Sequence, residues 1–399
     1  MAPPLHVLIV GGGVAALEAT LALRALAKDL VDIELLAPDE DFVYRPMAVA
    51  EPFRQGEARR FPLARLVELA GGRLTSGTLH QVDLERRIAS TADGAELDWD
   101  VLVLALGART REGIPGSLTF RGPEDRAALT ELIDEAASGQ VRSLTFALPT
   151  LAAWPLPLYE LALMAKIGLE DTGATEVVIE VVTPEAEPLA VFGREASASV
   201  KQLLETRGIG LREHTTPVVF RHGALVVVPG RAIRTDRVVS LPIPQGRRIP
   251  GMPDDGRGFI RADQYGRVES REDVYAAGDI TAFPLKQGGI ATQQADAVAE
   301  SIAAQAGVSI TPAPFRPVLR GLLLTGLTPR YLRASLLDDA SAVDSEPLWW
   351  PPAKIVGRYL APFLAEHIGL SAEPPPAAVA AGLQVDVELE PYAVTQSDG

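Results

Sequence analysis

The chain has 399 residues, of which 47% are hydrophobic and 22% are charged, and its formal net charge is −15. This length suits two globular domains rather than one core, and so negative a chain repels phosphate backbones and anionic lipid headgroups. We therefore expect no nucleic-acid partner. The chain contains no cysteine, which excludes structural and redox disulfides, thiolate metal sites and iron–sulfur clusters.

The N-terminus and the apolar segments give no sign of export or of a membrane span. Residues Met1–Val10 lack the basic start of a secretion signal. No segment approaches the roughly 18–20 uninterrupted apolar residues that a span requires. We expect a cytoplasmic protein. The five histidines show no metal-ligand spacing, so no metal site is predicted.

The first part of the chain follows a strand–turn–helix–strand plan. A strand begins at Leu5 and leads through glycines into a helix over Ala15–Leu30 and a strand over Val31–Leu36. A further strand is predicted over Asp98–Ala105. A mostly parallel sheet with a covering helix is therefore expected.

A second unit repeats this plan after a crossing at Pro115 and Gly116. Its predicted elements are a strand over Leu144–Leu148, a helix from about Pro157 and a strand over Val177–Val182. A hairpin bounded by prolines and a third glycine-containing block follow. Their ranges are Val218–Phe220 with Ala224–Val228, between Pro217 and Pro229, and then 259–306 with a helix over Ala291–Ala304.

The glycine-rich turn after the first strand matches the G-x-G-x-x-A pattern of dinucleotide-binding folds. Gly11 permits the tight turn, Gly13 lets the backbone approach a pyrophosphate, and Ala16 allows close packing of helix on strand. The free N–H groups of the helix start then favour the phosphates. The expected phosphate-binding turn comprises Gly11, Gly12, Gly13, Val14, Ala15 and Ala16.

An acidic residue that holds the ribose hydroxyls normally ends the second strand of such a fold. Here the strand runs into Ala37 and Pro38, with Asp39 just beyond. Asp39 is a candidate for this role, and an exposed acidic loop is the equally weighted alternative.

A second motif lies far along the chain, where a strand ends in small residues before Gly278 and Asp279. Asp279 is expected to accept a hydrogen bond from a ribityl hydroxyl. The next segment, Lys286–Ile290, opens a helix with Gly288 and Gly289, whose N–H groups suit the pyrimidine edge of a flavin. Lys286 either adds positive charge there or is a solvated surface lysine.

These motifs, with Ala105 and Gly107 between them, resemble the flavoproteins that include type II NADH dehydrogenases and sulfide:quinone oxidoreductases, over about residues 5–325. Leu106 stands where that family usually has threonine. The resemblance implies noncovalent FAD. It also implies that Arg45 and Pro46 pass close to the isoalloxazine. The positions it assigns to the adenine and the pyrophosphate are Val82 and Arg109, respectively.

The family layout implies an α/β fold with two Rossmann-like three-layer domains, the second inserted in the first, and a small C-terminal region. The predicted FAD domain is discontinuous, over 1–115 and 250–315, and the second domain, without a glycine motif, covers 116–249. A C-terminal cap or interface region covers 316–372, and a mobile tail covers 373–399.

The second domain has no glycine between Leu144 and Pro157, where type II NADH dehydrogenases bind NADH. Side chains in that turn block a pyrophosphate, and prolines remove N–H donors, so we expect the usual NAD(P)H site to be absent. Unorthodox docking over the flavin is the alternative. The Pro157–Glu160 stretch resembles sulfide:quinone oxidoreductases, but their sulfur route needs cysteines and is excluded.

Three side chains are candidates for chemistry: Lys286, Glu160 and Trp154. Glu160 could shuttle a proton. More often, a glutamate in the first turn of a helix only interacts favourably with the positive end of the helix dipole. Trp154 is placed to wall the flavin face, and an ordinary core or interface tryptophan is the favoured alternative. The Trp349–Trp350 pair and the stretch Lys354–Ile368 resemble the family's quinone and membrane region. Their poor amphipathic pattern favours a lid or self-association surface.

The leading hypothesis is an FAD-dependent oxidoreductase that passes electrons between a small donor and a quinone-like or other acceptor, without a redox disulfide. One alternative is a type II-like NAD(P)H dehydrogenase with an unusual nicotinamide site. The other is a flavin-binding protein whose second domain is non-catalytic. A homodimer and peripheral membrane contact stay open, the latter not favoured.

Overall fold

The structure is a computed structural model that describes residues 3–338 and 340–367. A five-stranded parallel sheet forms the base of the first domain, in the order β20-β9-β1-β2-β5. The edge strand β20 comes from a part of the chain far beyond β9, so the sheet combines two separate stretches of the chain. The strands are β1 (Leu5–Val10), β2 (Val31–Ala37), β5 (Arg73–Ser76), β9 (Val101–Leu104) and β20 (Val274–Ala276).

Alternate side chains of β1 point to opposite faces of the sheet, and each face is covered by a further layer of structure. Val7 and Ile9 pack in a cluster with helix α1, whereas Leu8 and Val10 pack in a cluster with Val82 from an antiparallel sheet. One face of the parallel sheet is therefore covered by helices and the other by a meander. The helices are α1 (Val14–Ala27), α2 (Leu63–Leu69) and α6 (Gly288–Gln305), and the meander strands are β6 (Leu79–Asp83), β7 (Ile88–Thr91) and β8 (Glu96–Asp98).

A second five-stranded parallel sheet, in the order β11-β18-β12-β13-β14, forms the inserted domain. Its strands are β11 (Leu118–Thr119), β12 (Ser143–Ala147), β13 (Val178–Val182), β14 (Gly210–Arg212) and β18 (Arg237–Ser240). The helices are α3 (Arg126–Ala137), α4 (Leu156–Asp171) and α5 (Arg194–Thr206), with a meander of β15 (Thr216–Arg221), β16 (Ala224–Val228) and β17 (Ile233–Arg234). The two crossings between domains pair antiparallel as β10 (Arg109–Arg111) and β19 (Ile243–Gln245).

This arrangement confirms the predicted fold class, and it corrects two details. The strand expected over Asp98–Ala105 is two strands in different sheets, β8 and β9, because the chain leaves the meander at Trp99 and Asp100. Pro217 does not end the hairpin but lies inside β15, next to a register shift. A bulged edge strand tolerates a residue without an N–H donor.

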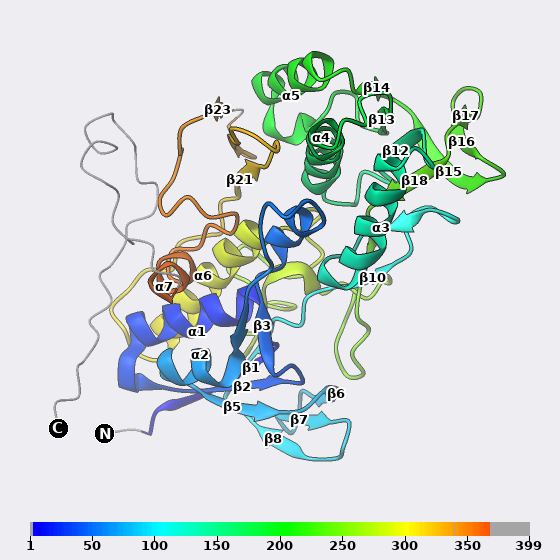
Figure 1. The fold of residues 1–399 in the computed structure, drawn as a ribbon. Coiled ribbons are helices and arrows are strands. Elements are labelled where there is room, and N and C mark those ends of the chain that lie inside the picture. Colours follow the sequence, from blue (N-terminus) through cyan, green and yellow to red (C-terminus); the bar gives the residue numbers. More distant parts are fainter. Residues whose placement is uncertain (1–2, 339, 368–399) are drawn as a thin grey trace.

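The C-terminal region forms a small antiparallel sheet and a last helix beside α1 and α6 (Figure 1). Trp349 is fully buried against Tyr331, with ring centroids 5.1 Å apart, so it is a core residue rather than a surface anchor. In the described residues, no helix is long and apolar enough to cross a membrane. The remaining strands and α-helix are β3 (Asp41–Val43), β4 (Arg60–Pro62), β21 (Val318–Leu323), β22 (Arg330–Ser335), β23 (Ser341–Asp344) and α7 (Leu360–His367). The predicted tail, 373–399, lies outside the described residues.

Candidate active site

The glycine turn between β1 and α1 has the geometry that a phosphate-binding loop requires. Gly11 has φ +132°, and a Cβ at this position would overlap the carbonyl oxygen of Ala105. Gly13 is the N-cap of α1, and no atom lies within 4 Å of where its Cβ would stand. Ala16 is fully buried against the sheet. The turn is therefore closed on its inner side and open at Gly13, where a pyrophosphate would approach the helix start.

The starts of α1 and α6 meet at Gly278. Its φ of +79° favours glycine, and a Cβ there would stand 3.0 Å from Ala15 Cβ and 3.4 Å from Ala291 Cβ. Asp279 follows directly, so the two motifs that are far apart in the chain lie side by side, with α1 packed along α6 (Figure 1). This juxtaposition fits one extended dinucleotide that reaches both helix starts.

The first turn of α6 leaves two amides available. The Gln287 side chain accepts a 2.8 Å hydrogen bond from the N–H of Ile290, so Ile290 contributes no free donor. Within the described residues, no acceptor lies on the N–H groups of Gly288 and Gly289. The positive end of the helix dipole is thus presented by these two glycines.

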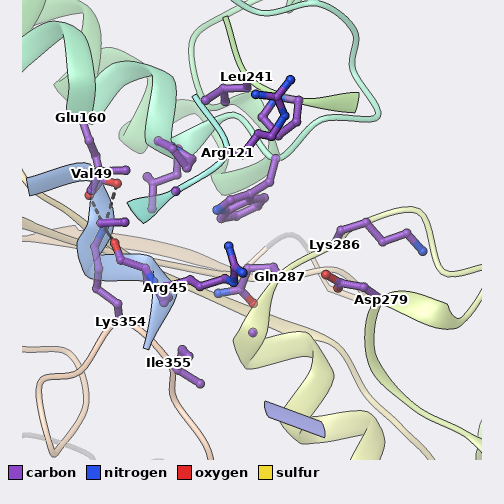
Figure 2. Close-up of a pocket in the computed structure, with 18 of the residues that line it drawn as sticks. Arg45, Val49, Arg121, Glu160, Leu241, Asp279, Lys286, Gln287, Lys354 and Ile355 are labelled. Atoms are coloured by element: carbon purple, nitrogen blue, oxygen red, sulfur yellow. Dashed lines mark hydrogen bonds and ion pairs between the residues drawn. The ribbon is translucent and has the colours of Figure 1, made fainter. Parts of the chain in front are cut away.

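Asp279 and Lys286 lie at one side of the site (Figure 2). Burial raises the pKa of Asp279 to about 6, and the nearby Lys286 charge opposes that shift. The Lys286 Nζ donates to the carbonyls of Thr281 and Phe283 at 2.5 and 2.7 Å, and burial lowers its pKa to about 8. The ammonium group of Lys286 is therefore fixed by backbone carbonyls rather than solvated. The side chain points away from Gln287 in Figure 2.

The other residues assigned by resemblance are scattered along the expected length of the cofactor. Arg45 pairs with Glu124 at 3.1 Å, and Pro46 lies beside it. Asp39 is exposed, and Arg109 is an exposed residue of β10. Both act electrostatically on the half-buried Arg247, which the sequence did not single out. At the expected adenine end, Val82 donates its N–H to the Pro250 carbonyl at 2.9 Å, so that amide is not free for an adenine.

A cavity of about 330 Å³ lies between the start of α6 and the second domain, and all three predicted catalytic candidates line it. Glu160 and Lys354 face each other at one end, and Asp279 and Lys286 lie at the other (Figure 2). The apolar wall comes from the second domain and the C-terminal sheet. It includes Phe120, Trp154, Leu156, Leu241 and Leu322.

Glu160 and Lys354 form a buried ion pair that the sequence did not reveal. Lys354 Nζ lies 2.6 Å from Glu160 Oε1, and the two side chains are 5% and 0% exposed. The N–H of Leu324 also donates to Glu160 Oε1 at 2.8 Å, and Lys354 Nζ donates to the Pro46 carbonyl at 3.2 Å. Burial raises the pKa of Glu160 and lowers that of Lys354. Both shifts ease transfer of a proton between the two groups.

The start of α4 differs from that of a nucleotide-binding helix. Pro155 is its N-cap, and the preceding turn contains Trp154, whose ring packs edge-on against Phe192 at 5.8 Å. Glu185 follows β13 at the place where a Rossmann fold holds an acidic residue for ribose, but it is only 6% exposed. The Tyr159 hydroxyl donates to it at 2.6 Å. This carboxylate is therefore occupied by the protein itself.

Comparison with known proteins agrees with this geometry. Residues 5–139 match the family model described as pyridine nucleotide-disulphide oxidoreductase. The chain is 27% identical over 332 residues to the benzene 1,2-dioxygenase system ferredoxin–NAD(+) reductase subunit of Pseudomonas putida, covering 74% of each protein. It is 26% identical over 207 residues to the sulfide-quinone reductase of Aquifex aeolicus (strain VF5), covering 50% of this chain and 47% of that protein.

Solved structures show the same fold. The sulfide:quinone oxidoreductase from Aquifex aeolicus has a TM-score of 0.78 at 18% identity, with 86% of this chain and 87% of that chain covered. The putidaredoxin reductase–putidaredoxin complex has a TM-score of 0.62 at 16% identity, with 83% and 81% covered. This chain is an FAD-dependent oxidoreductase. The predicted cofactor and enzyme class are thereby confirmed.

The residues of this flavoenzyme fit FAD at the places described above. The open backbone at Gly13, the contact of Gly278 with Ala15 and the free amides of Gly288 and Gly289 are the features such a ligand needs. The role of each individual residue stays a prediction.

Proposed function

We propose that the enzyme passes electrons between a small donor and a quinone-like acceptor that binds beside the flavin ring, against the second-domain wall of the 330 Å³ cavity. The bound FAD supplies the two-electron and one-electron chemistry, since the cysteine-free chain has no disulfide to do so. The observation that carries the proposal is an apolar cavity with a buried acid–base pair, Glu160 and Lys354, in its wall. A planar, uncharged ring suits the apolar lining.

Glu160 and Lys354 support this proposal through proton supply. Reduction of a quinone to a hydroquinone takes up two electrons and two protons, so an acceptor site needs a proton donor within it. Lys354 holds a proton against Glu160 at 2.6 Å and lines the same cavity. Since burial lowers the pKa of the lysine, the proton is released more readily than from a surface lysine.

The second domain argues against NAD(P)H as the ordinary donor. Pro155 and Pro157 remove backbone donors at the start of α4, and Glu185 already binds Tyr159. The second candidate is nevertheless a nicotinamide-dependent reductase, since the Pseudomonas putida relative is named a ferredoxin–NAD(+) reductase subunit. A non-catalytic second domain is the third candidate. The cytoplasmic location also stays a prediction.

Anaerobic flavin kinetics separate these candidates. The FAD-loaded protein is photoreduced, mixed with quinones or with dye acceptors, and followed at the flavin absorbance band. We expect quinones to reoxidise the flavin at least tenfold faster than buffer alone, and Glu160→Gln to slow that step while leaving FAD content unchanged. Oxidised protein mixed with NADH should bleach slowly.

Two results would decide otherwise. Rapid bleaching by micromolar NADH favours the nicotinamide-dependent candidate. If no acceptor exceeds the rate seen with air, the non-catalytic candidate replaces the proposal. Glu131→Gln, on the exposed surface of α3, is the matched control for loss of one carboxylate.

A further inference from the structure

A strap of seven residues, 353–359, joins the C-terminal sheet to α7 and crosses the starts of α1 and α6. Lys354 and Ile355 line the cavity from this strap. The N–H of Ile355 donates to the Tyr44 hydroxyl at 2.9 Å, and the Val356 carbonyl accepts from Thr292 Oγ1 at 2.7 Å. The position of Lys354 in the site therefore depends on how this strap is seated.

The far end of the strap is held by a carboxylate from α1. Glu18 is fully buried, and its two oxygens accept the N–H groups of Tyr359 and Leu360 at 2.9 and 2.8 Å. The partly buried carboxyl of Asp296, from α6, lies within reach of Glu18, and each of the two groups affects the pKa of the other. The Asp296 Oδ1 atom is buried and has no hydrogen-bond partner in the part of the chain that the structure describes.

A hydrogen bond between two carboxyl groups requires a proton on one of them. Arg358 is the cation that faces the pair, and it is shared with Glu300, whose Oε1 lies 3.7 Å from Arg358 Nη1. Glu300 also repels the pair. Burial and the neighbouring Glu18 raise the pKa of Asp296 well above its usual range. The proton therefore sits on Asp296 and is donated to Glu18, which keeps both oxygens as acceptors for the strap.

We propose that Glu18 and Asp296 are positioning residues, whose one shared proton seats the strap and thereby holds Lys354 in the cavity. The proposal that this proton seats the strap is independent of which electron acceptor the enzyme uses. The proposal that strap opening slows catalysis rests on the proposed function. Loss of the proton leaves two carboxylates facing each other in a buried site, and the strap is displaced to let water reach them.

The direction of the pH effect follows from linkage. The seated state binds a proton that the open state releases above the ordinary aspartate pKa of about 3.9. The seated state is therefore favoured at low pH and loses stability as the pH rises toward the raised pKa of Asp296. For one proton, the ratio of open to seated strap rises about tenfold per pH unit in that interval.

Trypsin reports the seating directly, because the strap contains two of its cleavage sites, Lys354 and Arg358. The FAD-loaded full-length protein is digested between pH 6 and 9, and cleavage at these sites is divided by cleavage at the exposed Arg86 in the same sample. Native-state cleavage follows the open population when opening is fast. We expect the ratio to rise by up to tenfold per pH unit in the wild-type chain.

Three variants test whether Glu18 and Asp296 cause the rise of the cleavage ratio with pH. Asp296→Asn keeps a permanent donor toward Glu18 and should make the ratio independent of pH. Glu18→Gln replaces one accepting oxygen by an NH2 group, which cannot accept a hydrogen bond from the strap. This variant should therefore be cleaved more than wild type at every pH. Asp29→Asn, whose side chain is fully exposed, is the control for charge and should behave as wild type.

Two outcomes overturn the proposal: a flat ratio in the wild-type chain, or a slope that survives in Asp296→Asn. If Glu18→Gln does not fold, the Asp296→Asn comparison alone decides. Because an open strap no longer holds Lys354 in the cavity, quinone-driven reoxidation by the wild-type protein should slow as the pH rises. Asp296→Asn, measured in the same way, should not show this decline. A further outcome is that the cleavage ratio of Asp296→Asn becomes independent of pH while its reoxidation rate keeps the pH dependence of the wild-type protein. In that case Glu18 and Asp296 do seat the strap, and the role given to Lys354 is wrong.

Discussion

Replacement of Lys354 by methionine tests the buried pair beside the cavity. Methionine keeps most of the volume of the side chain but removes the charge next to Glu160, which is 0% exposed. A buried carboxylate without its partner takes up a proton instead of staying charged. The folded variant therefore holds one proton on Glu160 that the unfolded chain loses above the ordinary glutamate pKa of about 4.3.

The size of the effect follows from the same proton count. In the wild-type chain, the pair holds one proton in both the folded and the unfolded state across neutral pH, so it adds no pH dependence. In the variant, the free energy of unfolding should fall by about 1.4 kcal/mol per pH unit above pH 4.3. The loss should level off at about 3–5 kcal/mol, the usual cost of removing one partner of a buried ion pair.

Urea unfolding at pH 5, 6, 7 and 8, with FAD in excess, measures this loss. The double variant Glu160→Gln with Lys354→Met carries no buried charge and should recover most of the stability at pH 8. A loss that is the same at pH 5 and pH 8 would refute the assignment of an uncompensated Glu160. A loss below about 1 kcal/mol at pH 8 would show that water reaches the carboxylate after the substitution.

Three further substitutions test the site and the second domain. The Cβ of Gly13→Val would have no protein atom within 4 Å, so we expect normal folding of the apoprotein but at least a 100-fold weaker FAD affinity by titration. Gly11→Ala would overlap the Ala105 carbonyl at φ +132° and should lower the urea midpoint even without FAD. Tyr159→Phe removes the 2.6 Å hydrogen bond to Glu185 and should cost about 1–3 kcal/mol of unfolding free energy, since the carboxylate stays buried. An unchanged FAD affinity, an unchanged midpoint and a cost near zero, respectively, would contradict these expectations.

The flavin half was readable from the sequence because its constraints are local. At Gly11 and Gly278, a side chain would strike neighbouring backbone or helix atoms, so the residue type itself records the close approach. Strand, turn and helix follow one another within about 25 residues, and periodicity detects such units. Continuity of apolar residues misled the prediction only where one run spans two sheets, from Asp98 to Ala105.

The acid–base pair was not readable, for the opposite reason. Glu160 and Lys354 are 194 residues apart in the chain, so no local pattern joins them. Lys354 appeared in the sequence analysis only as the first residue of the stretch Lys354–Ile368. Its partner and its burial depend on the seating of the strap, which is a tertiary property. The same holds for Arg247, which lies with Arg109 and Asp39 only because two domain crossings pair as β10 and β19.

The residues at the start of α4 in the second domain have two structural effects. The turn after β12 carries Trp154 and Pro155 where a nucleotide-binding fold needs glycines and free amides, so we expect it to exclude a pyrophosphate. Trp154 and Leu156, on the same segment, form part of the apolar wall of the cavity. Restoring glycine at position 154 would therefore not by itself create a nicotinamide site, because Tyr159 still occupies Glu185. It would also remove part of the wall of the cavity in which we propose that the acceptor binds.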